Sequence, residues 1–427
     1  MAEFLLLPFG SAGDTFPFIG LGRHLKDRGH HVRLLCNGYF RSAVESADLI
    51  MDEFWNKQEY LNTMENPDLW HPVKSFNAVV GHPLMARMVE EQHQYIIEQF
   101  NRNPNIVVVA GTLAFGARIA RETHGLKMAS VHLSPTVILS VDRPPHLPTM
   151  AIPAWWPRSW VRGFYWLADK MFITPTMNKV VGAYRKELVL PKVKNYFRDW
   201  IHSRELTLGL FPSWFAPPAA DWPASIKLMD FPFYDNANPD GLPLEVLEFI
   251  QSGPPPIVVT FGSAMRVGAK LFQAAVEACQ QLPCRAILLT PFAEQIPQPL
   301  PETILHCPFL SLSQILPYAA TLIHHGGIGT MSQGLRWGVP QVITPLAHDQ
   351  FDNAARGEAL GVSVTIPGAR LTGKNLAKAL NKIYDERILH KNAHAISQRF
   401  VGIDTFRMIG DELEQFARRP PSTKFRT

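Results

Sequence analysis

The chain has 427 residues, nearly three times a typical domain of ~150 residues, so we expect two domains. Its 41 Lys and Arg residues exceed its 37 Asp and Glu residues by only four, which gives no electrostatic reason to expect nucleic acid as a partner. Charged residues make up 18% of the chain, below the usual ~25%. A hydrophobic content of 46% is enough for large cores and excludes global disorder.

The cysteines and the apolar segments bear on the cellular compartment. Four cysteines are too few for a disulfide framework, and no Cys/His cluster has the spacing of zinc ligands. The N-terminus carries Glu3 where a signal peptide needs positive charge, and no apolar run reaches the ~18 residues of a membrane span. These features predict a cytoplasmic protein with reduced thiols, at most peripheral at the inner face of the membrane.

A βαβ unit is predicted over the first 36 residues. The apolar run 4–9 predicts a strand, residues 10–14 a glycine-rich turn, and the apolar spacing from Phe18 onward a helix that ends at Gly29. A strand at 32–36 then pairs in parallel with the first, because the helix crosses over between them. Further buried strands are predicted at 106–110, 128–131 and 206–211.

The same alternation restarts in the second half of the chain. A strand is predicted at 257–261 and a helix at 271–281. More strands, separated by helical segments, are predicted at 286–290, 303–306, 322–325, 341–344 and 362–366. Residues 221–255, roughly, are rich in proline, which is typical of a linker, and residues 404–416 predict an amphipathic helix before a basic tail.

This alternation predicts an α/β fold with two Rossmann-like parallel sheets. We assign residues 1–225 to an N-terminal domain and 226–402 to a C-terminal domain. Parallel α/β domains bind ligands at the carboxyl ends of their strands, so loops from both halves should face one central cleft.

A glycine-rich turn follows the predicted strand 322–325. Glycines between a strand and a helix let the backbone approach a ligand, and the helix start presents free N–H groups and a positive dipole end. This suits a diphosphate, with His325 and the Thr330 hydroxyl as further donors beside Gly327 and Gly329. Alternatively, the glycines only allow tight helix–strand packing. The turn has neither the Lys of an ATPase P-loop nor the spaced glycines of a dinucleotide site.

Two other predicted turns carry acidic residues. Asp349 and Gln350 follow the strand 341–344 and together offer the acceptors and donors that suit sugar hydroxyls, unless Asp349 is a helix N-cap. Asp14 follows the first strand beside Ser11 and Gly13. It is either an N-cap or a general base at the floor of the cleft.

Aromatic residues are concentrated in one segment, since seven of the ten tryptophans fall between residues 150 and 222. Trp155, Trp156, Trp160 and Phe164 lie close together among prolines and arginines. Such a cluster can pack in a core, line a channel for an apolar acceptor, or lie at a membrane interface. The residues alone leave these interpretations open.

Five motifs occur in order along nearly the whole chain. They are Gly10–Asp14 with Pro17, Phe261-Gly262-Ser263, His325–Thr330, Gly338-Val339-Pro340, and Asp349-Gln350 with Asn353. In this combination the chain resembles the nucleotide-sugar glycosyltransferases of family 1, which have the GT-B fold of two Rossmann-like domains. Residues 10–19 and 211–218 are most similar to the bacterial rhamnosyltransferases of rhamnolipid synthesis.

The resemblance implies a role for each candidate residue. Asp14 falls on the general base, in a loop with Ser11 and Gly13. The donor diphosphate falls on Ser263, His325, Gly327, Gly329 and Thr330, the donor sugar on Asp349 and Gln350, and the nucleobase on Phe309. The acceptor region is expected at Trp155, Trp156, Trp160 and Phe164. The C-terminal helix and tail, 403–427, are expected to pack back toward the N-terminal domain.

The implied activity is inverting transfer of L-rhamnose from dTDP-L-rhamnose to a hydroxy fatty acyl lipid. No DxD-like metal site is evident, so we expect neither a metal nor a cofactor, with the dTDP- or UDP-linked sugar as substrate. The stretch 106–111 offers no carboxylate to pair with a catalytic histidine, which agrees with Asp14 acting directly. Alternatives are glucosyl transfer from UDP-glucose or dTDP-glucose to a sterol, polyketide or phenol, a nucleotide-sugar epimerase, and a non-catalytic auxiliary subunit.

Overall fold

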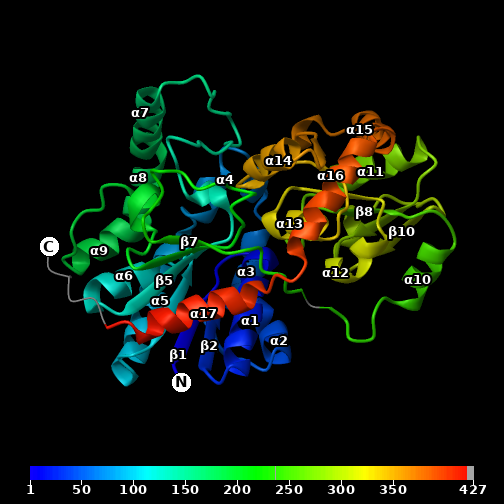
Figure 1. Ribbon diagram of the computed structural model, residues 1–427. Helices are drawn as coiled ribbons and strands as arrows, with labels where there is room; N and C mark the ends of the chain where they lie inside the picture. The colour runs from blue at the N-terminus through cyan, green and yellow to red at the C-terminus, as the bar shows by residue number, and fades with distance from the viewer. Residues whose placement is uncertain (236, 421–427) are drawn as a thin grey trace.

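A computed structural model describes residues 1–235 and 237–420, which form two α/β domains side by side (Figure 1). The N-terminal sheet has seven strands in the order β3-β2-β1-β4-β5-β6-β7, and the C-terminal sheet has six in the order β10-β9-β8-β11-β12-β13. Neighbouring strands within each sheet pair in parallel. The predicted α/β class with two parallel sheets is therefore confirmed.

The strands are short and most are buried on both faces. Those of the N-terminal sheet are β1 Glu3–Leu7, β2 His31–Cys36, β3 Ile50–Glu53, β4 Val107–Gly111, β5 Lys127–His132, β6 Leu206–Gly209 and β7 Ile226–Leu228. Those of the C-terminal sheet are β8 Ile257–Thr260, β9 Ala286–Leu289, β10 Ile304–Cys307, β11 Thr321–His324, β12 Gln341–Ile343 and β13 Ser363–Thr365. Only β3 and β7 were not predicted. Both are edge strands without a buried residue, so they lack the apolar run that marks the others.

Helices cover both faces of each sheet. In the N-terminal domain they are α1 Ala12–Asp27, α2 Arg41–Ser46, α3 Lys57–Met64, α4 Ser75–Val79, α5 Pro83–Arg102, α6 Phe115–His124, α7 Arg158–Ala168, α8 Thr174–Met177 and α9 Ala183–Glu187. In the C-terminal half they are α10 Leu244–Gln251, α11 Ala269–Gln280, α12 Leu312–Ile315, α13 Ile328–Arg336, α14 Gln350–Ala359, α15 Gly373–Asp385, α16 Arg387–Ser397 and α17 Thr405–Arg418.

The first helix begins earlier than predicted. Residues 10–14 were expected to form a turn, but α1 starts at Ala12 and takes Asp14 into its first turn. Ser11 occupies the N-cap position with an extended backbone, and the Asp14 carboxylate reaches back to the Ser11 backbone N–H at 2.8 Å. This reciprocal capping satisfies a donor that the helix start would otherwise leave without a partner, which is why the helix extends to this point.

The predicted boundary at residue 225 lies too early. β7 pairs with β6 and so belongs to the N-terminal sheet, which ends at Leu228. The predicted linker, 221–255, also includes α10, whose Val246 is buried in the C-terminal core. The chain therefore crosses between the domains over roughly residues 229–243.

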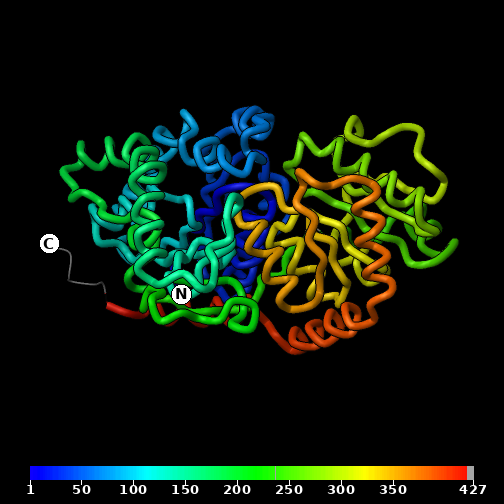
Figure 2. Tube along the Cα trace, turned by 90° about the horizontal axis from the view of Figure 1, so that it is seen from above, coloured from blue at the N-terminus to red at the C-terminus, as the bar shows by residue number. Residues whose placement is uncertain are grey.

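The C-terminal helix returns to the first domain. α17 packs against α1, and Figure 1 shows it crossing the front of the N-terminal domain, along the edge at which the red trace lies in Figure 2. Arg28 at the end of α1 forms ion pairs with Asp411 at 2.7 Å and Glu414 at 2.8 Å. Of the predicted tail, residues 421–427 lie outside the described residues. Within residues 1–235 and 237–420, no helix combines the length and the apolarity that crossing a membrane requires.

Candidate active site

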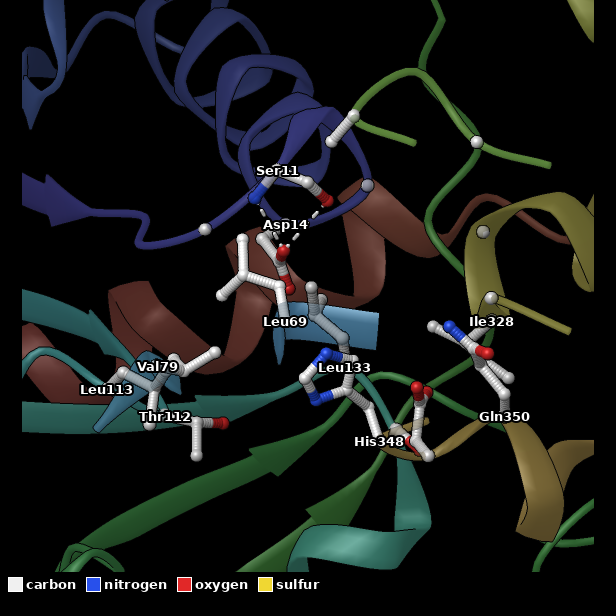
Figure 3. Close-up of a pocket in the computed structure, with 18 of the residues that line it drawn as sticks. Ser11, Asp14, Leu69, Val79, Thr112, Leu113, Leu133, Ile328, His348 and Gln350 are labelled. Atoms are coloured by element: carbon white, nitrogen blue, oxygen red, sulfur yellow. Dashed lines mark hydrogen bonds between the residues drawn. The ribbon is translucent and has the colours of Figure 1, made fainter. Parts of the chain in front are cut away.

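A cavity of about 1470 Å³ lies between the domains, lined by loops at the carboxyl ends of strands from both sheets. It exceeds the ~300–1,000 Å³ of ordinary small-molecule pockets, so it has room for two ligands. Figure 3 shows Asp14 directed from the start of α1 toward His348, with Gln350 on the opposite wall. The two domains thus place different chemical groups around one space.

Asp14 is a partly buried carboxylate on the N-terminal wall. Its Oδ2 accepts hydrogen bonds from the Ser11 backbone N–H at 2.8 Å and from the Ser11 hydroxyl at 3.0 Å. Burial raises the pKa of Asp14 to about 6, the Ser11 hydrogen bonds oppose this rise, and the negative charge of Asp349 adds to it. A carboxylate whose pKa lies near neutral pH is suited to accept a proton from a substrate hydroxyl.

Gly10 provides the space that this carboxylate occupies. Its φ is +132°, and a Cβ there would lie 2.3 Å from the Asp14 Oδ2. A side chain at residue 10 would therefore both strain the backbone and displace the carboxylate.

The glycine-rich turn lies on the opposite wall, as a helix start. α13 begins at Ile328 with Gly327 at its N-cap, so no side chain caps the first backbone N–H groups. Gly329 and Thr330 belong to this first turn, and both line the cavity. The free N–H groups and the positive dipole end are suited to bind a phosphate.

His325 is held between two glycines beside this helix start. A Cβ on Gly262 would lie 3.1 Å from its Cε1, and one on Gly327 would lie 2.6 Å from its Nε2. The ring is 8% exposed, and its Nδ1 has no hydrogen-bond partner among the described residues. Burial, with smaller effects from His324 and His348, lowers its pKa to about 3, so the ring is neutral and keeps one N–H to donate.

Asp349 and Gln350 lie at the start of α14. Asp349 occupies the N-cap position but its side chain does not cap the helix, and its Oδ2 instead accepts from the Asn353 amide at 2.8 Å. Burial raises the pKa of Asp349. The Gln350 Oε1 accepts from the backbone N–H groups of Leu346 at 2.8 Å and Ala347 at 3.0 Å, which leaves the Gln350 Nε2 as its donor toward the cavity.

The remaining donor-side candidates also line the cavity. Ser263 follows β8 and is exposed to the space beside Gly262. Phe309 is 56% exposed, at the edge of the same wall. On the N-terminal side, Ser11 and Gly13 line it beside Asp14.

The predicted acceptor region is corrected in part. Phe164 lines the cavity, but Trp155, Trp156 and Trp160 do not. The three tryptophans pack edge to face on one another, with ring centroids 6.1–6.4 Å apart, and Trp155 is 72% exposed. Trp155 and Trp160 are thus exposed, whereas Trp156 is half-buried and packs against the small core of Val141, Val161 and Tyr165. Trp155 and Trp156 precede α7, and Trp160 lies in its first turn.

Two cavity tryptophans, Trp55 and Trp70, were not predicted, because neither lies in a motif or in the aromatic-rich segment. Trp70 lies in the 3₁₀ turn Pro67–Trp70 of the N-terminal domain. Its ring packs edge-on against His325 at 6.4 Å and His348 at 6.0 Å, across the domain boundary. Its indole N–H is buried and has no hydrogen-bond partner among the described residues.

The N-terminal part of the cavity is apolar. Side chains from α4, α5, α7 and the segments around them line it, including Phe76, Val80, Met85, Phe164, Met171 and Phe172. Asp14 lies between this compartment and the helix start of α13. Within the described residues, no group of three or more His, Cys, Asp or Glu residues is placed to hold a metal ion.

Known proteins share both halves of this architecture. Residues 4–141 match the glycosyltransferase family 28 N-terminal domain, and residues 286–404 match the C-terminal domain of the erythromycin biosynthesis protein CIII-like family. The chain is 27% identical, over 88% of each sequence, to O-mycaminosyltylonolide 6-deoxyallosyltransferase of Streptomyces fradiae. It is also 26% identical to a sterol 3-beta-glucosyltransferase of Saccharomyces cerevisiae. That match spans the whole of this chain but only 36% of the length of the relative.

Solved structures show the same fold. The glycosyltransferase of kitacinnamycin superimposes with a TM-score of 0.73 at 18% identity, over 97% of this chain and 99% of that one. Glycosyltransferase VinC, solved in complex with dTDP, superimposes with a TM-score of 0.68 at 18% identity, over 98% and 100%. The fold is therefore GT-B. The two family models match separate parts of the chain, one in each domain.

Proposed function

We propose that the chain is an inverting, metal-independent glycosyltransferase that transfers a sugar from a nucleoside diphosphate to the hydroxyl of an apolar acceptor. One observation carries this proposal. Asp14, with its raised pKa, lies between an apolar compartment and the uncapped start of α13 in a single cavity. We assign the apolar compartment to the acceptor, Asp14 to the base and the start of α13 to the diphosphate, which is the order that the reaction requires.

In the proposed reaction, the acceptor hydroxyl enters from the apolar compartment and Asp14 takes its proton. The acceptor oxygen forms a bond to the anomeric carbon as the bond from that carbon to the diphosphate oxygen breaks on the opposite face. The departing diphosphate carries the negative charge. We assign its stabilisation to the first-turn N–H groups of α13, with His325, Thr330 and Ser263 as further donors. This arrangement supplies the electrostatic role that a metal ion has in other transferases.

The other donor contacts follow from the same placement. We assign the sugar hydroxyls to the Asp349 carboxylate and the Gln350 Nε2, and the nucleobase to the exposed ring of Phe309. The incoming diphosphate would raise the pKa of His325, because a negative charge favours the protonated ring. His325 would then bind the leaving group more strongly as its charge develops.

Two acceptor classes fit the apolar compartment. The motifs at 10–19 and 211–218 favour L-rhamnose transfer from dTDP-L-rhamnose to a hydroxy fatty acyl lipid. The relatives favour a second candidate, transfer of glucose or a deoxysugar to a sterol or polyketide, since one is named a 6-deoxyallosyltransferase and others are named sterol glucosyltransferases. A neighbouring structure that contains dTDP supports a dTDP-linked donor in either case.

A mass-spectrometric screen distinguishes these candidates. Purified protein is incubated with dTDP-L-rhamnose, dTDP-glucose or UDP-glucose, each with hydroxyacyl lipids, sterols, macrolide aglycones and polyphenols. We expect a glycosylated apolar product that is absent with Asp14→Asn. Transfer only to polar acceptors would refute the apolar assignment. Conversion of the donor without any acceptor would favour an epimerase, and no turnover with any pair would favour an auxiliary subunit.

A further inference from the structure

The N-terminal domain exposes a group of large apolar side chains around α7. Each of these side chains is 48–72% exposed. We call the group the aromatic patch; its members are Trp155, Trp160, Trp166, Leu167, Met171 and Phe172. Three of the six are tryptophans, the side chain that prefers the boundary between water and a lipid bilayer. Trp155 and Trp160 pack edge-on with ring centroids 6.3 Å apart, and a group of large exposed apolar side chains in one segment of the chain can mark an interaction surface.

Five of the six side chains of the aromatic patch lie on one helical segment, and Trp155 lies just before it. α7, the π-helical turn Asp169–Ile173 and α8 follow one another without a break. Trp160, Leu167 and Met171 are spaced by seven and four residues, which places them on the same side of that segment. Figure 1 shows α7 at the outer edge of the N-terminal domain, away from the C-terminal domain. The aromatic patch can therefore meet a flat surface.

The aromatic patch is continuous with the cavity. Leu167, Met171 and Phe172 are exposed and also line the cavity, so they stand at its opening. Phe164, on the same helix, lines the cavity and packs edge-on against Trp156 with ring centroids 6.3 Å apart. Apolar side chains thus lead from the outside of the domain into the apolar compartment.

The charges around the aromatic patch are mostly positive. Residues 153–179 include four basic side chains and one acidic side chain, a net charge of +3 in a chain whose total is +4. Arg158 pairs with Asp142. In the described part of the chain, Arg162, Lys170 and Lys179 have no ion pair and are exposed. A basic rim around tryptophans complements an anionic lipid surface.

We propose that the aromatic patch docks on the surface of an anionic lipid bilayer, with the cavity opening toward the lipid. The proposed contact is interfacial, through inserted tryptophans and a basic rim. An apolar acceptor would then reach Asp14 from the bilayer without crossing water. This consequence rests on the proposed function, whereas the docking itself does not.

Vesicle binding tests the docking without donor or acceptor. Full-length protein is sedimented with vesicles of phosphatidylcholine alone or with added phosphatidylglycerol, and brominated phosphatidylcholine reports tryptophan insertion by quenching. We expect binding that phosphatidylglycerol strengthens and that high salt weakens. The combined variant Trp155→Ser, Trp160→Ser and Trp166→Ser should bind about tenfold more weakly or worse and lose the quenching. Trp337→Ser, which changes a 39% exposed tryptophan of the C-terminal domain, should bind like the wild type.

Two results would overturn the proposal. One is a wild-type protein that sediments with neither kind of vesicle, and the other is a triple variant that binds as tightly as the wild type. Light scattering separates a third outcome, in which the aromatic patch pairs two copies of the chain. Dimers that the triple variant abolishes, with no vesicle binding, would assign the aromatic patch to self-association instead. Circular dichroism should show unchanged folding, because all three tryptophans are exposed.

Discussion

The carboxylates of Asp14 and Asp349 come from different domains and act on each other across one cavity. Burial is the main cause that raises the pKa of Asp14 to about 6, and the negative charge of Asp349 raises it further. Asp14 follows β1, and Asp349 follows β12 in the other sheet. The pKa of the proposed base thus depends on the contact between the two domains, and not on the N-terminal domain alone.

Replacing the proposed base tests its role directly. Asp14→Asn keeps the size of the side chain but removes its ability to take a proton. We expect kcat to fall by about 10²–10⁴-fold, the usual contribution of general base catalysis. The affinity for the nucleoside diphosphate, measured by titration calorimetry, should change little, because the diphosphate site lies on the other wall. Turnover near that of the wild type would exclude Asp14 as the base.

The pH dependence should report the pKa of Asp14. Activity needs the ionised carboxylate, so kcat/KM should rise with pH, with a midpoint near pH 6, and then level off. Ser11→Ala removes a hydrogen bond that lowers the pKa and should move this limb to higher pH. Asp349→Asn removes a negative charge that raises it and should move the limb to lower pH, whatever its effect on overall rate. If the midpoint of the pH profile stays unchanged in both variants, or shifts in the same direction in both, the assignment of this pKa to Asp14 is contradicted.

The position of His325 can be changed without touching the histidine. A Cβ on Gly327 would lie 2.6 Å from the His325 Nε2, so Gly327→Ala should push the ring out of place. We expect the affinity for the nucleoside diphosphate to fall by about 1–3 kcal/mol, the value of a lost hydrogen bond to a charged group. The double variant with His325→Ala is the control. If the two losses add fully, Gly327 acts on the phosphate by another route.

The contact between the domains includes a buried carboxylate, Asp352 on α14. Its Oδ2 accepts from Thr136 at 3.1 Å and from Arg356 at 2.8 Å, and its Oδ1 accepts from the His146 backbone N–H at 2.9 Å. Asp352→Ala leaves the charge of Arg356 without its partner and should lower the free energy of unfolding by about 3 kcal/mol.

Thr136→Val is the matched change for this contact. It removes one hydrogen bond and should cost only about 1 kcal/mol. Urea unfolding measures both values. Equal losses in the two variants would show that the carboxylate contributes no more than its bond to Thr136.

Local patterns predicted most of the fold. Eleven strands have buried apolar runs that can be recognised one at a time, whereas β3 and β7 have none and were missed. The predicted helix start after the glycine-rich turn appears as the N-terminus of α13. The predicted start of α1 lies too late, because the apolar spacing begins only at Phe18. The helix actually starts at a polar contact, the hydrogen bond from the Ser11 backbone N–H to Asp14, which an apolar pattern does not reveal.

The candidate residues near the starts of α1, α13 and α14 were found because glycine turns and polar side chains after strands are local signals. The aromatic residues were not separable in this way. Trp155, Trp156 and Trp160 were expected at the acceptor and lie outside the cavity, whereas Trp70 reaches across to His325. The composition shows that a segment is rich in aromatic side chains, but it does not show which of them face the cavity and which face the solvent.

The length and the alternating apolar runs determined two parallel α/β domains, since eleven of the thirteen described strands carry a local apolar signal. Only the tertiary structure decided what the two domains make together. The raised pKa of Asp14, the packing of Trp70 against His325 and the opening beside α7 all depend on segments far apart in sequence. Burial and charge act through space, so their effects appear only once the domains are in contact.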